Sequence, residues 1–365
     1  MTNSEIIHRR LLNQQIARSK FKRPQEIVTW LVAMQAQEYA MAKWAIGLRV
    51  PGLKDADIEK AFNEGAILRT HLMRPTWHFV TPADIRWMLA LTAPRVHAVS
   101  GFMHRKLELD NKIFNRTNNT LVKTLRGGKY LTRQALRSAL EKVKIATDET
   151  RLSHLMMNAE LEGIVCSGPR VGKQFTYALL DERVPLPFRR TFNREAALSE
   201  LATRYFASRG PATARDFANW SGLTMKDAMA GVATLSPDFA HQATDGKDYV
   251  FVRTASKSNS FKAEQATFLM PDYDEYGMSY KDRSAIFDPN DLTAQIRGNS
   301  PVYNRMLVID GKIEGTWHRI LKNNSVAVET FPFTSLSKAK HQAVMIAVKR
   351  YRSFMSEEFK EKTKE

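Results

Sequence analysis

Apolar residues recur three and four positions apart in the first part of the chain, a spacing that predicts amphipathic helices. One helix is expected within residues 4–20, a second from Pro24 onward, and a third over residues 54–64. Residues 66–82 predict two short strands that an Arg-Pro pair interrupts, because proline cannot donate to a β-ladder. Helices followed by a strand pair are the order of a winged helix, a unit that binds nucleic acid in many proteins.

The same order recurs further along the chain. Residues 128–181 predict a short strand, a helix capped at Thr132, a second helix and a strand–turn–strand wing. Residues 194–254 predict helices with a helix-turn-helix whose turn lies at Ser221 and Gly222, followed by a hairpin around an Asp-Gly pair. The agreement between these segments supports an internal repeat of winged helices.

A polar break after residue 256 separates a last segment, with an expected hairpin around Asp310 and Gly311 and a basic helix from Lys338. We therefore predict an α+β protein, mainly helical, with three tandem winged helix-turn-helix modules and a C-terminal β-containing segment. The predicted boundaries are 1–115 for the first module with its connecting helices, 116–188 for the second, 189–256 for the third, and 257–365 for the C-terminal hairpin and helix.

Composition points to the kind of partner. The chain has 365 residues, and its 43% hydrophobic content is that of a folded globular protein. With 55 Lys and Arg against 38 Asp and Glu, the formal net charge is +17. Such a charge favours a polyanionic partner, nucleic acid before an anionic membrane surface, with a soluble basic enzyme as the alternative.

Cellular location is indicated only by what the sequence lacks. The first residues have no apolar signal-peptide core, and no apolar run reaches the ~18 residues of a membrane span. The one cysteine, Cys166, cannot form an intramolecular disulfide or a thiolate zinc site, and it lies in a predicted buried strand. We expect a cytoplasmic protein without a membrane partner.

Patterns with catalytic or metal-binding potential fail on spacing. The stretch GPRVGKQ has too few residues between its glycines for a phosphate loop. His97 and His104 share a predicted helix face but are too far apart for a usual metal-binding pair, so packing roles are favoured. The sequence implies no metal and no cofactor.

An acidic cluster is formed by Asp272, Asp274 and Glu275. These carboxylates can hold a hard cation in principle, but the spacing of a calcium loop is absent. Structural turns, or ion pairs with Lys281 and Arg283, are the favoured interpretation.

Two glutamines, Gln35 and Gln37, stand where an apolar helix pattern breaks off. In a continuing helix their side chains would point about 200° apart, whereas in extended backbone residues two apart face the same side. The pair can therefore act together only if the helix ends near Met34. From the residues alone, surface polar filler is the simpler interpretation.

Four stretches change that interpretation, because together they resemble one family. They are residues 27–49 with the glutamines, residues 69–96, the helix-turn-helix RDFANWSGL, and MPDYDEYGMSYKDRSA with the later GTWHR. In this order they resemble the bacterial winged-helix DNA glycosylases of the azinomycin-resistance, AlkZ-like type, from about residue 5 to residue 335. The resemblance implies three winged helices in a C-shaped body that excises alkylated bases and unhooks interstrand crosslinks.

The resemblance also implies the catalytic residues. The family's motif is glutamine, an apolar residue, then glutamine or aspartate, and here it stands as Gln35, Ala36 and Gln37, the two-glutamine branch. Hydrolysis of an N-glycosidic bond normally needs an acid on the base and a base on water. A purine alkylated at an imidazole nitrogen is already cationic and leaves without protonation, so neutral amides that hold water suffice. The implied activity is a monofunctional DNA N-glycosylase for cationic purines.

The resemblance makes His71, Arg74 and His78, with Arg69 just before them, candidates for the wall of the site or for phosphate contacts. Four further basic residues are candidate phosphate contacts: Lys43 and Arg49, close to the glutamines, and Arg170 and Lys173 on the second wing. For His71 and His78, polar residues satisfied inside a wing are an equal alternative. Trp44 and Trp77 can stack on a base, although tryptophans at these spacings more often fill a core.

A different function stays open beside this one. A non-catalytic winged-helix DNA-binding protein, such as a transcriptional regulator, would use the glutamines structurally. Regulators of this class usually dimerise on two half-sites, whereas a body of three modules can enclose duplex DNA as a monomer. We expect a monomer whose partner is double-stranded DNA with alkylated bases or crosslinks.

Overall fold

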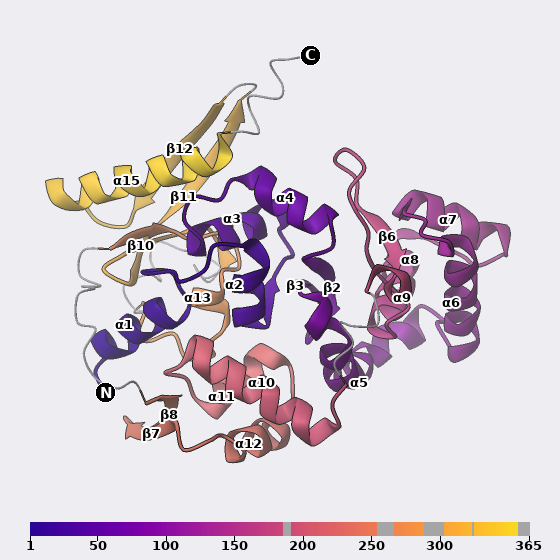
Figure 1. The fold of residues 1–365 in the computed structure, drawn as a ribbon, viewed down its shortest axis with the longest axis horizontal. Coiled ribbons are helices and arrows are strands. Elements are labelled where there is room, and N and C mark those ends of the chain that lie inside the picture. The colour runs from indigo at the N-terminus through magenta and orange to yellow at the C-terminus, as the bar shows by residue number, and fades with distance from the viewer. Residues whose placement is uncertain (185–190, 254–265, 288–302, 323–324, 357–365) are drawn as a thin grey trace. The chain divides into compact units, whose positions relative to one another are not determined.

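The computed structural model describes residues 1–184, 191–253, 266–287, 303–322 and 325–356. The chain forms two compact units (Figure 1). Unit 1 holds Met1–Glu59, Ser199–Trp220 and Thr224–Glu365, and unit 2 holds Lys60–Leu198 and Ser221–Leu223. Among the described residues, helices of enough length and apolarity to cross a membrane are absent.

The order helix, strand, two helices, two strands repeats along the chain. The first set is α2 (Pro24–Leu31), β1 (Ala33–Gln35), α3 (Tyr39–Arg49), α4 (Asp55–Asn63), β2 (Leu68–Leu72) and β3 (Thr76–Val80). The second is α6 (Asn111–Leu125), β4 (Leu131–Thr132), α7 (Arg133–Lys142), α8 (Glu149–Leu161), β5 (Val165–Ser167) and β6 (Thr176–Leu179). The third is α10 (Arg194–Arg209), α11 (Ala214–Ser221), α12 (Met225–Ala233), β7 (Phe239–Thr244) and β8 (Lys247–Val252). In the third set, a bridge from Ala212 to Val250 stands in place of the first strand.

The remaining elements flank these sets. They are α1 (Asn3–Asn13), α5 (Pro82–Lys106), α9 (Leu180–Arg183), β9 (Thr267–Leu269), α13 (Glu275–Met278), β10 (Met306–Ile309), β11 (Lys312–Lys322), β12 (Ser325–Pro332) and α15 (Lys338–Met355). The predicted α+β class is confirmed, and the helix from Lys338 begins where it was expected. Helix α1 ends earlier than predicted, and Gln15 beyond it has a φ of 60°, a left-handed backbone that no longer continues the helix.

A four-stranded antiparallel sheet, β12-β11-β10-β9, forms the C-terminal part of unit 1. Its core is shared with α3 and α15, where the Trp44 ring lies 5.0 Å from Tyr351 and 5.1 Å from Phe354. Helix α15 approaches α3 closely because residue 47 is glycine, where a Cβ would lie 2.4 Å from the Phe354 ring. Trp44 is therefore a core residue, as such spacings more often indicate, and its indole Nε1 donates to the carbonyl of Leu269 at 2.7 Å.

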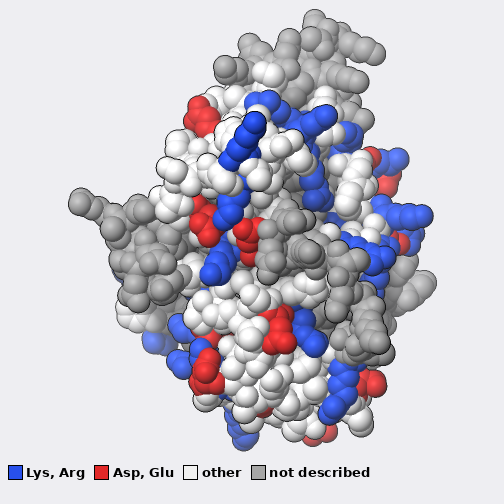
Figure 2. All heavy atoms as spheres, turned by 90° about the vertical axis from the view of Figure 1, so that its left-hand side faces the viewer, with Lys and Arg blue, Asp and Glu red and all other residues white. Residues whose placement is uncertain are grey.

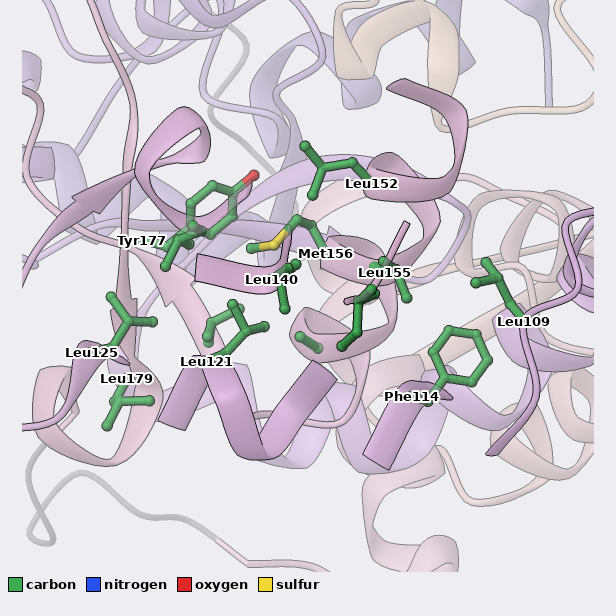
Figure 3. Close-up of a cluster of buried hydrophobic side chains, with 14 residues drawn as sticks. Leu109, Phe114, Leu121, Leu125, Leu140, Leu152, Leu155, Met156, Tyr177 and Leu179 are labelled. Atoms are coloured by element: carbon green, nitrogen blue, oxygen red, sulfur yellow. The ribbon is translucent and has the colours of Figure 1, made fainter. Parts of the chain in front are cut away.

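Unit 2 is built around helices α6, α7 and α8 and the sheet β4-β6-β5. Leucines dominate its core, and Figure 3 shows them meeting Phe114, Met156 and Tyr177 from several elements. Helix α7 begins at the predicted cap, since the Thr132 hydroxyl accepts from the amide of Ala135. Cys166 is fully buried in β5, and burial raises the pKa of its thiol to about 12. It is thus a small core residue, as predicted.

Candidate active site

The glutamine motif lies on an extended turn directly after α2. The helix ends at Leu31, and Val32 has φ 64° and ψ −55°, a rare and strained conformation for a β-branched residue. Ala33–Gln35 are then extended. The condition that the sequence set for a cooperating glutamine pair, a helix that ends near Met34, is therefore met.

The two glutamines differ in exposure and contact each other. Gln35 is 8% exposed, Ala36 is fully buried, and Gln37 is exposed. The side-chain oxygen Oε1 of Gln35 accepts a hydrogen bond from the backbone amide of Gln37 at 2.8 Å. This bond fixes which way the Gln35 amide faces, so its oxygen and its NH₂ group lie in defined directions.

A buried ion pair holds this turn from behind. Arg209 donates from Nη1 to the carbonyl of Leu31 at 2.9 Å and from Nη2 to that of Ala33 at 3.0 Å. Its guanidinium therefore holds both sides of the strained Val32. Glu275 accepts from Arg209 Nη2 at 2.8 Å and, through its other oxygen, from the backbone amide of Gln35 at 2.9 Å.

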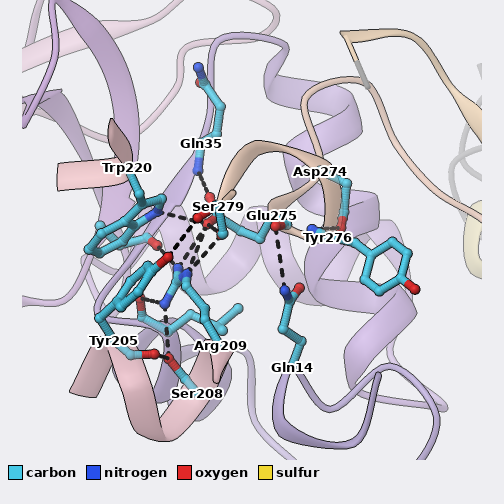
Figure 4. Close-up of polar contacts among 12 residues, drawn as sticks. Gln14, Gln35, Tyr205, Ser208, Arg209, Trp220, Asp274, Glu275, Tyr276 and Ser279 are labelled. Carbon is cyan, nitrogen blue, oxygen red and sulfur yellow. Dashed lines mark hydrogen bonds and ion pairs between the residues drawn. The ribbon is translucent and has the colours of Figure 1, made fainter. Parts of the chain in front are cut away.

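Glu275 is the centre of this network. Figure 4 shows the carboxylate between Gln35, Arg209, Trp220 and Ser279, with the Gln35 side chain directed away from it. The Trp220 indole donates to the carboxylate at 3.0 Å and the Ser279 hydroxyl at 2.7 Å. Burial alone would raise the pKa of Glu275, but Arg209 and the hydrogen bonds from Gln35 and Ser279 lower it to about 2. The carboxylate is therefore ionised at neutral pH and acts as a fixed anchor for the motif.

A second buried pair joins Arg49 and Asp274. The guanidinium of Arg49 meets both carboxylate oxygens at 2.8 Å, and both side chains are 0% exposed. It also donates to the carbonyl and side-chain oxygens of Gln14 at 3.1 and 3.0 Å. The prediction that Arg49 contacts phosphate is wrong, because the guanidinium is enclosed and its donors serve this part of unit 1.

Lys43 requires the same correction. Its ammonium lies between the carboxylates of Asp55, at 2.5 Å, and Glu59, at 2.8 Å, and its side chain is 8% exposed. A buried lysine that is neutralised twice cannot serve as a backbone phosphate contact. It fastens α3 to α4 instead.

The acidic cluster forms ion pairs, as favoured, but with partners other than those expected. Asp272 pairs with Arg305 at 3.0 Å, Asp274 with Arg49, and Glu275 with Arg209. In the part of the chain that the structure describes, clusters of three or more histidine, cysteine, aspartate or glutamate side chains suited to a metal ion are absent.

Four candidate residues lie on the β2–β3 hairpin of unit 2 and its turn. His71 pairs through Nδ1 with Glu160 of α8, and His78 is fully buried with Nδ1 3.0 Å from the carbonyl of Thr76. Arg69 is buried, and Arg74 lies in the turn with intermediate exposure. For His71 the pair with Glu160 favours the alternative of a polar residue satisfied within the wing, and the role of His78 stays a prediction.

The second wing carries the remaining candidates. Between β5 and β6, Val171 and Lys173 are exposed at the tip. The backbone amide of Arg170 donates to Asn63 Oδ1 at 2.8 Å, and its guanidinium donates to the carbonyl of Lys173. These bonds fix the tip internally while Lys173 projects from it.

Sequence reasoning did not find Arg209, and it assigned Glu275 only to a structural cluster. Arg209 is one of 55 basic residues, and it follows an ordinary helix pattern. Glu275 stands beside Asp272 and Asp274, and nothing in the sequence sets it apart from these neighbouring carboxylates. The pair spans 66 residues, and the contact of Glu275 with Gln35 spans 240.

Comparison with known proteins agrees with this architecture. The structure has the fold of a DNA glycosylase, since it matches the solved structure of Streptomyces sahachiroi DNA glycosylase AlkZ with a TM-score of 0.79 at 17% identity, over 97% of this chain and 96% of that one. The sequence model described as DNA glycosylase AlkZ-like matches residues 28–354, so the chain belongs to the AlkZ-like DNA glycosylase family. A curated relative, the Interstrand DNA cross-link repair glycosylase of Streptomyces sahachiroi, is 22% identical over 328 residues, which are 85% of each chain.

Proposed function

We propose that this protein is a monofunctional DNA glycosylase that hydrolyses the N-glycosidic bond of cationic alkylated purines and unhooks interstrand crosslinks of that chemistry. The observation that carries the proposal is the glutamine pair on a strained, extended turn that a buried Arg209–Glu275 pair holds. Strained backbone of this kind clusters at active sites and persists only where the surroundings impose it. Glutamines that only occupied the surface would not need a buried ion pair to hold their backbone.

The two amides have separate roles in this proposal. The Gln35 oxygen uses one lone pair for the Gln37 amide, which leaves the second for a water molecule or the cationic sugar. The exposed Gln37 side chain supplies the other half of the water site. An oriented amide stabilises positive charge on the sugar without reorganising during the reaction.

The absence of an acid in the motif defines the substrate class. Glu275 is the carboxylate bonded to the Gln35 backbone, and with a pKa of about 2 it holds no proton to donate. A neutral base would need such a proton to leave. A purine that an alkyl group has made cationic does not, and so the motif selects damaged bases by their charge.

The three sets of elements support DNA as the substrate. Each has the order of a winged helix, and we propose that they act as tandem winged-helix modules on duplex DNA, with the protein as a monomer. The net charge of +17 suits a polyanion. Lys and Arg side chains are spread over the face in Figure 2, with fewer acidic side chains between them.

The test is base release from a duplex that carries one N7-methylated guanine. Wild type is expected to release the base and leave an intact abasic strand, and Gln35→Ala and Gln37→Ala are each expected to lose activity by about 100-fold or more. Glu38→Gln is the matched control, because it alters the exposed carboxylate next to the motif and is expected to keep activity. All variants are compared at equal DNA affinity and equal stability.

A different pattern would overturn the proposal. If wild type bound DNA as a dimer with a palindromic footprint and released no base from monoadduct or crosslink, the transcriptional-regulator function would replace it. If Glu38→Gln abolished release, the water would be activated by a carboxylate and the two-amide mechanism would be wrong. Strand cleavage by a lysine Schiff base would contradict the monofunctional assignment.

A further inference from the structure

Unit 2 contains a pocket that the glutamine motif does not use. Its volume is about 480 Å³, which lies within the range of small-ligand sites. The walls come from the β2–β3 hairpin, the β5–β6 wing and the start of α7. The lining residues are Arg69, Trp77, Thr132, Arg133, Gln134, Glu149, Leu152, Lys173, Gln174, Phe175 and Tyr177.

Part of the lining is a platform of aromatic rings around an arginine. The Arg69 guanidinium lies 4.3 Å from the Trp77 ring centre and 4.7 Å from that of Phe175. Arg69 is more than nine-tenths buried, whereas Trp77 and Phe175 are of intermediate exposure. Aromatic rings and guanidinium planes are the surfaces on which unpaired nucleobases stack.

The platform is supported from behind. On the β2–β3 hairpin His71 lies directly opposite Trp77, their ring centres are 4.4 Å apart, and His71 is in turn bonded to Glu160. The backbone amide of Arg69 donates to the Ser167 hydroxyl at 2.8 Å. These contacts fix the platform before any ligand arrives, which reduces the entropy cost of binding.

Another part of the lining suits a phosphate. Helix α7 begins there, with Thr132 as its N-cap, and the N-terminus of a helix attracts anions. Arg133 lies in its first turn, where the Ser153 hydroxyl accepts from Nη2 at 2.7 Å, and Lys173 is exposed on the wing. Glu149 is the one carboxylate in the lining, and it lies 3.8 Å from Arg133.

We propose that this pocket binds an unpaired nucleotide of DNA, with the base stacked on the Trp77–Arg69–Phe175 platform and the phosphate held by Arg133, Lys173 and the start of α7. The inference rests on the proposed action on duplex DNA, since disruption of a damaged base pair can free a nucleotide for such a pocket. The lining has three cationic side chains and one carboxylate. This excess of positive charge suits a ligand that carries a phosphate, and an uncharged aromatic ligand would not require it.

The experiment compares three undamaged duplexes by fluorescence anisotropy. One is fully paired, one carries a single extra adenosine nucleotide as a bulge, and one carries the same bulge without a base. Wild type is expected to prefer the adenosine bulge to the other two on the order of tenfold, since stacking of one base contributes that much. Trp77→Ala is expected to bring this ratio close to one, and Trp77→Phe to preserve most of it.

Arg133→Ala is expected to weaken binding of both bulged duplexes several-fold relative to the fully paired one, because both bulges present the phosphate that Arg133 would hold. Arg137→Ala is its matched control, because Arg137 lies one turn further along α7 and also pairs with Glu149 but does not line the pocket. Equal affinities for the three duplexes in wild type, or a ratio unchanged in Trp77→Ala, would overturn the assignment. Loss of the preference at micromolar free dAMP would assign the pocket to a free nucleotide instead.

These duplexes hold no lesion, so base release plays no part in the readout. A protein without glycosylase activity can still show the preference, and an active glycosylase can lack it. Failure of the pocket and failure of the proposed function are therefore separate results.

Discussion

Replacing Glu275 with glutamine tests whether the buried carboxylate holds the turn that carries Gln35 and Gln37. The substitution keeps the shape of the side chain and removes its charge, which leaves the Arg209 guanidinium, itself fully buried, without its counterion. The Gln35 amide would then donate to a neutral side chain, and the carbonyls on either side of Val32 would depend on an uncompensated cation. Both the stability of unit 1 and the placement of Gln35 are expected to suffer.

The expected loss of stability in Glu275→Gln follows from the buried ion pair and, separately, from the lowered pKa of Glu275. Breaking a buried pair by removing one partner costs about 3–5 kcal/mol. A carboxyl pKa of about 2 in place of 4.5 corresponds to about 3 kcal/mol at neutral pH. Because the folded state lowers this pKa, the contribution is complete above pH 4.5 and is lost as the pH falls toward 2. The difference between wild type and Glu275→Gln should shrink over the same range.

The assay is urea unfolding at pH 7 and at several values down to pH 3, with base release measured in parallel. Glu26→Gln is a control, since the pKa of Glu26 is also lowered to about 2, by backbone amides and Arg23, although the residue is at the surface. Solvent screens such a pair, so this variant should change stability far less. Base release in Glu275→Gln is expected to fall about 10-fold to 100-fold through misplacement of Gln35.

The reasoning would be refuted by a loss of less than about 1 kcal/mol in Glu275→Gln at pH 7, where a buried pair requires more. It would also be refuted if Glu26→Gln and Glu275→Gln destabilised the protein equally. Unchanged base release in a variant that is destabilised as expected would show that the ion pair supports the fold and has no part in placing the motif.

Other predictions concern separate features of the chain. Arg49→Lys should lower the free energy of unfolding by about 3 kcal/mol in urea titrations and leave DNA affinity unchanged. Lys173→Ala should leave stability unchanged, and binding at several salt concentrations should show a salt dependence lowered by about one phosphate contact. Gly311→Ala should cost about 1–3 kcal/mol by urea unfolding, because φ is 77° and the new Cβ would lie 2.1 Å from an isoleucine side chain of α1. Burial lowers the pKa of both His104 and His154, whose rings are 5.3 Å apart, so wild type should lose stability as the pH falls below 6.5. In a variant with both replaced by phenylalanine, the free energy of unfolding should depend less on pH. An unchanged pH dependence would exclude these histidines as the cause.

Much of the fold could be predicted because its signals are local. The helix cap at Thr132 and the hairpin turn at Asp310 and Gly311 each depend on a few neighbouring residues, and the structure has them where they were expected. The sequence shows that Gln35 and Gln37 can act together only on extended backbone. It does not show that the backbone there is extended, because the end of α2 depends on Arg209, far along the chain.

Basic residues show the limit more clearly. Arg49 and Lys173 are both basic residues in a basic chain, and only burial separates the enclosed ion pair from the exposed wing tip. Burial depends on which carboxylates the fold brings near, and a single sequence does not contain that information. For the same reason Trp44 and Trp77 resemble each other in sequence, although one fills a core and the other lines a pocket.

The distance along the chain between Gln35 and Glu275 has a consequence for synthesis on the ribosome. The amide and carboxylate that meet at 2.9 Å are separated by 240 residues. At ~5–20 residues per second, the ribosome needs on the order of 10–50 s to make that interval. Until Arg209 is made, the turn at Val32 lacks the guanidinium that holds it, and until Glu275 is made, Arg209 lacks its buried counterion. The geometry of the glutamine motif is therefore completed late, and translation that stops before residue 275 would release a fragment that carries Gln35 and Gln37 without the ion pair that holds their turn.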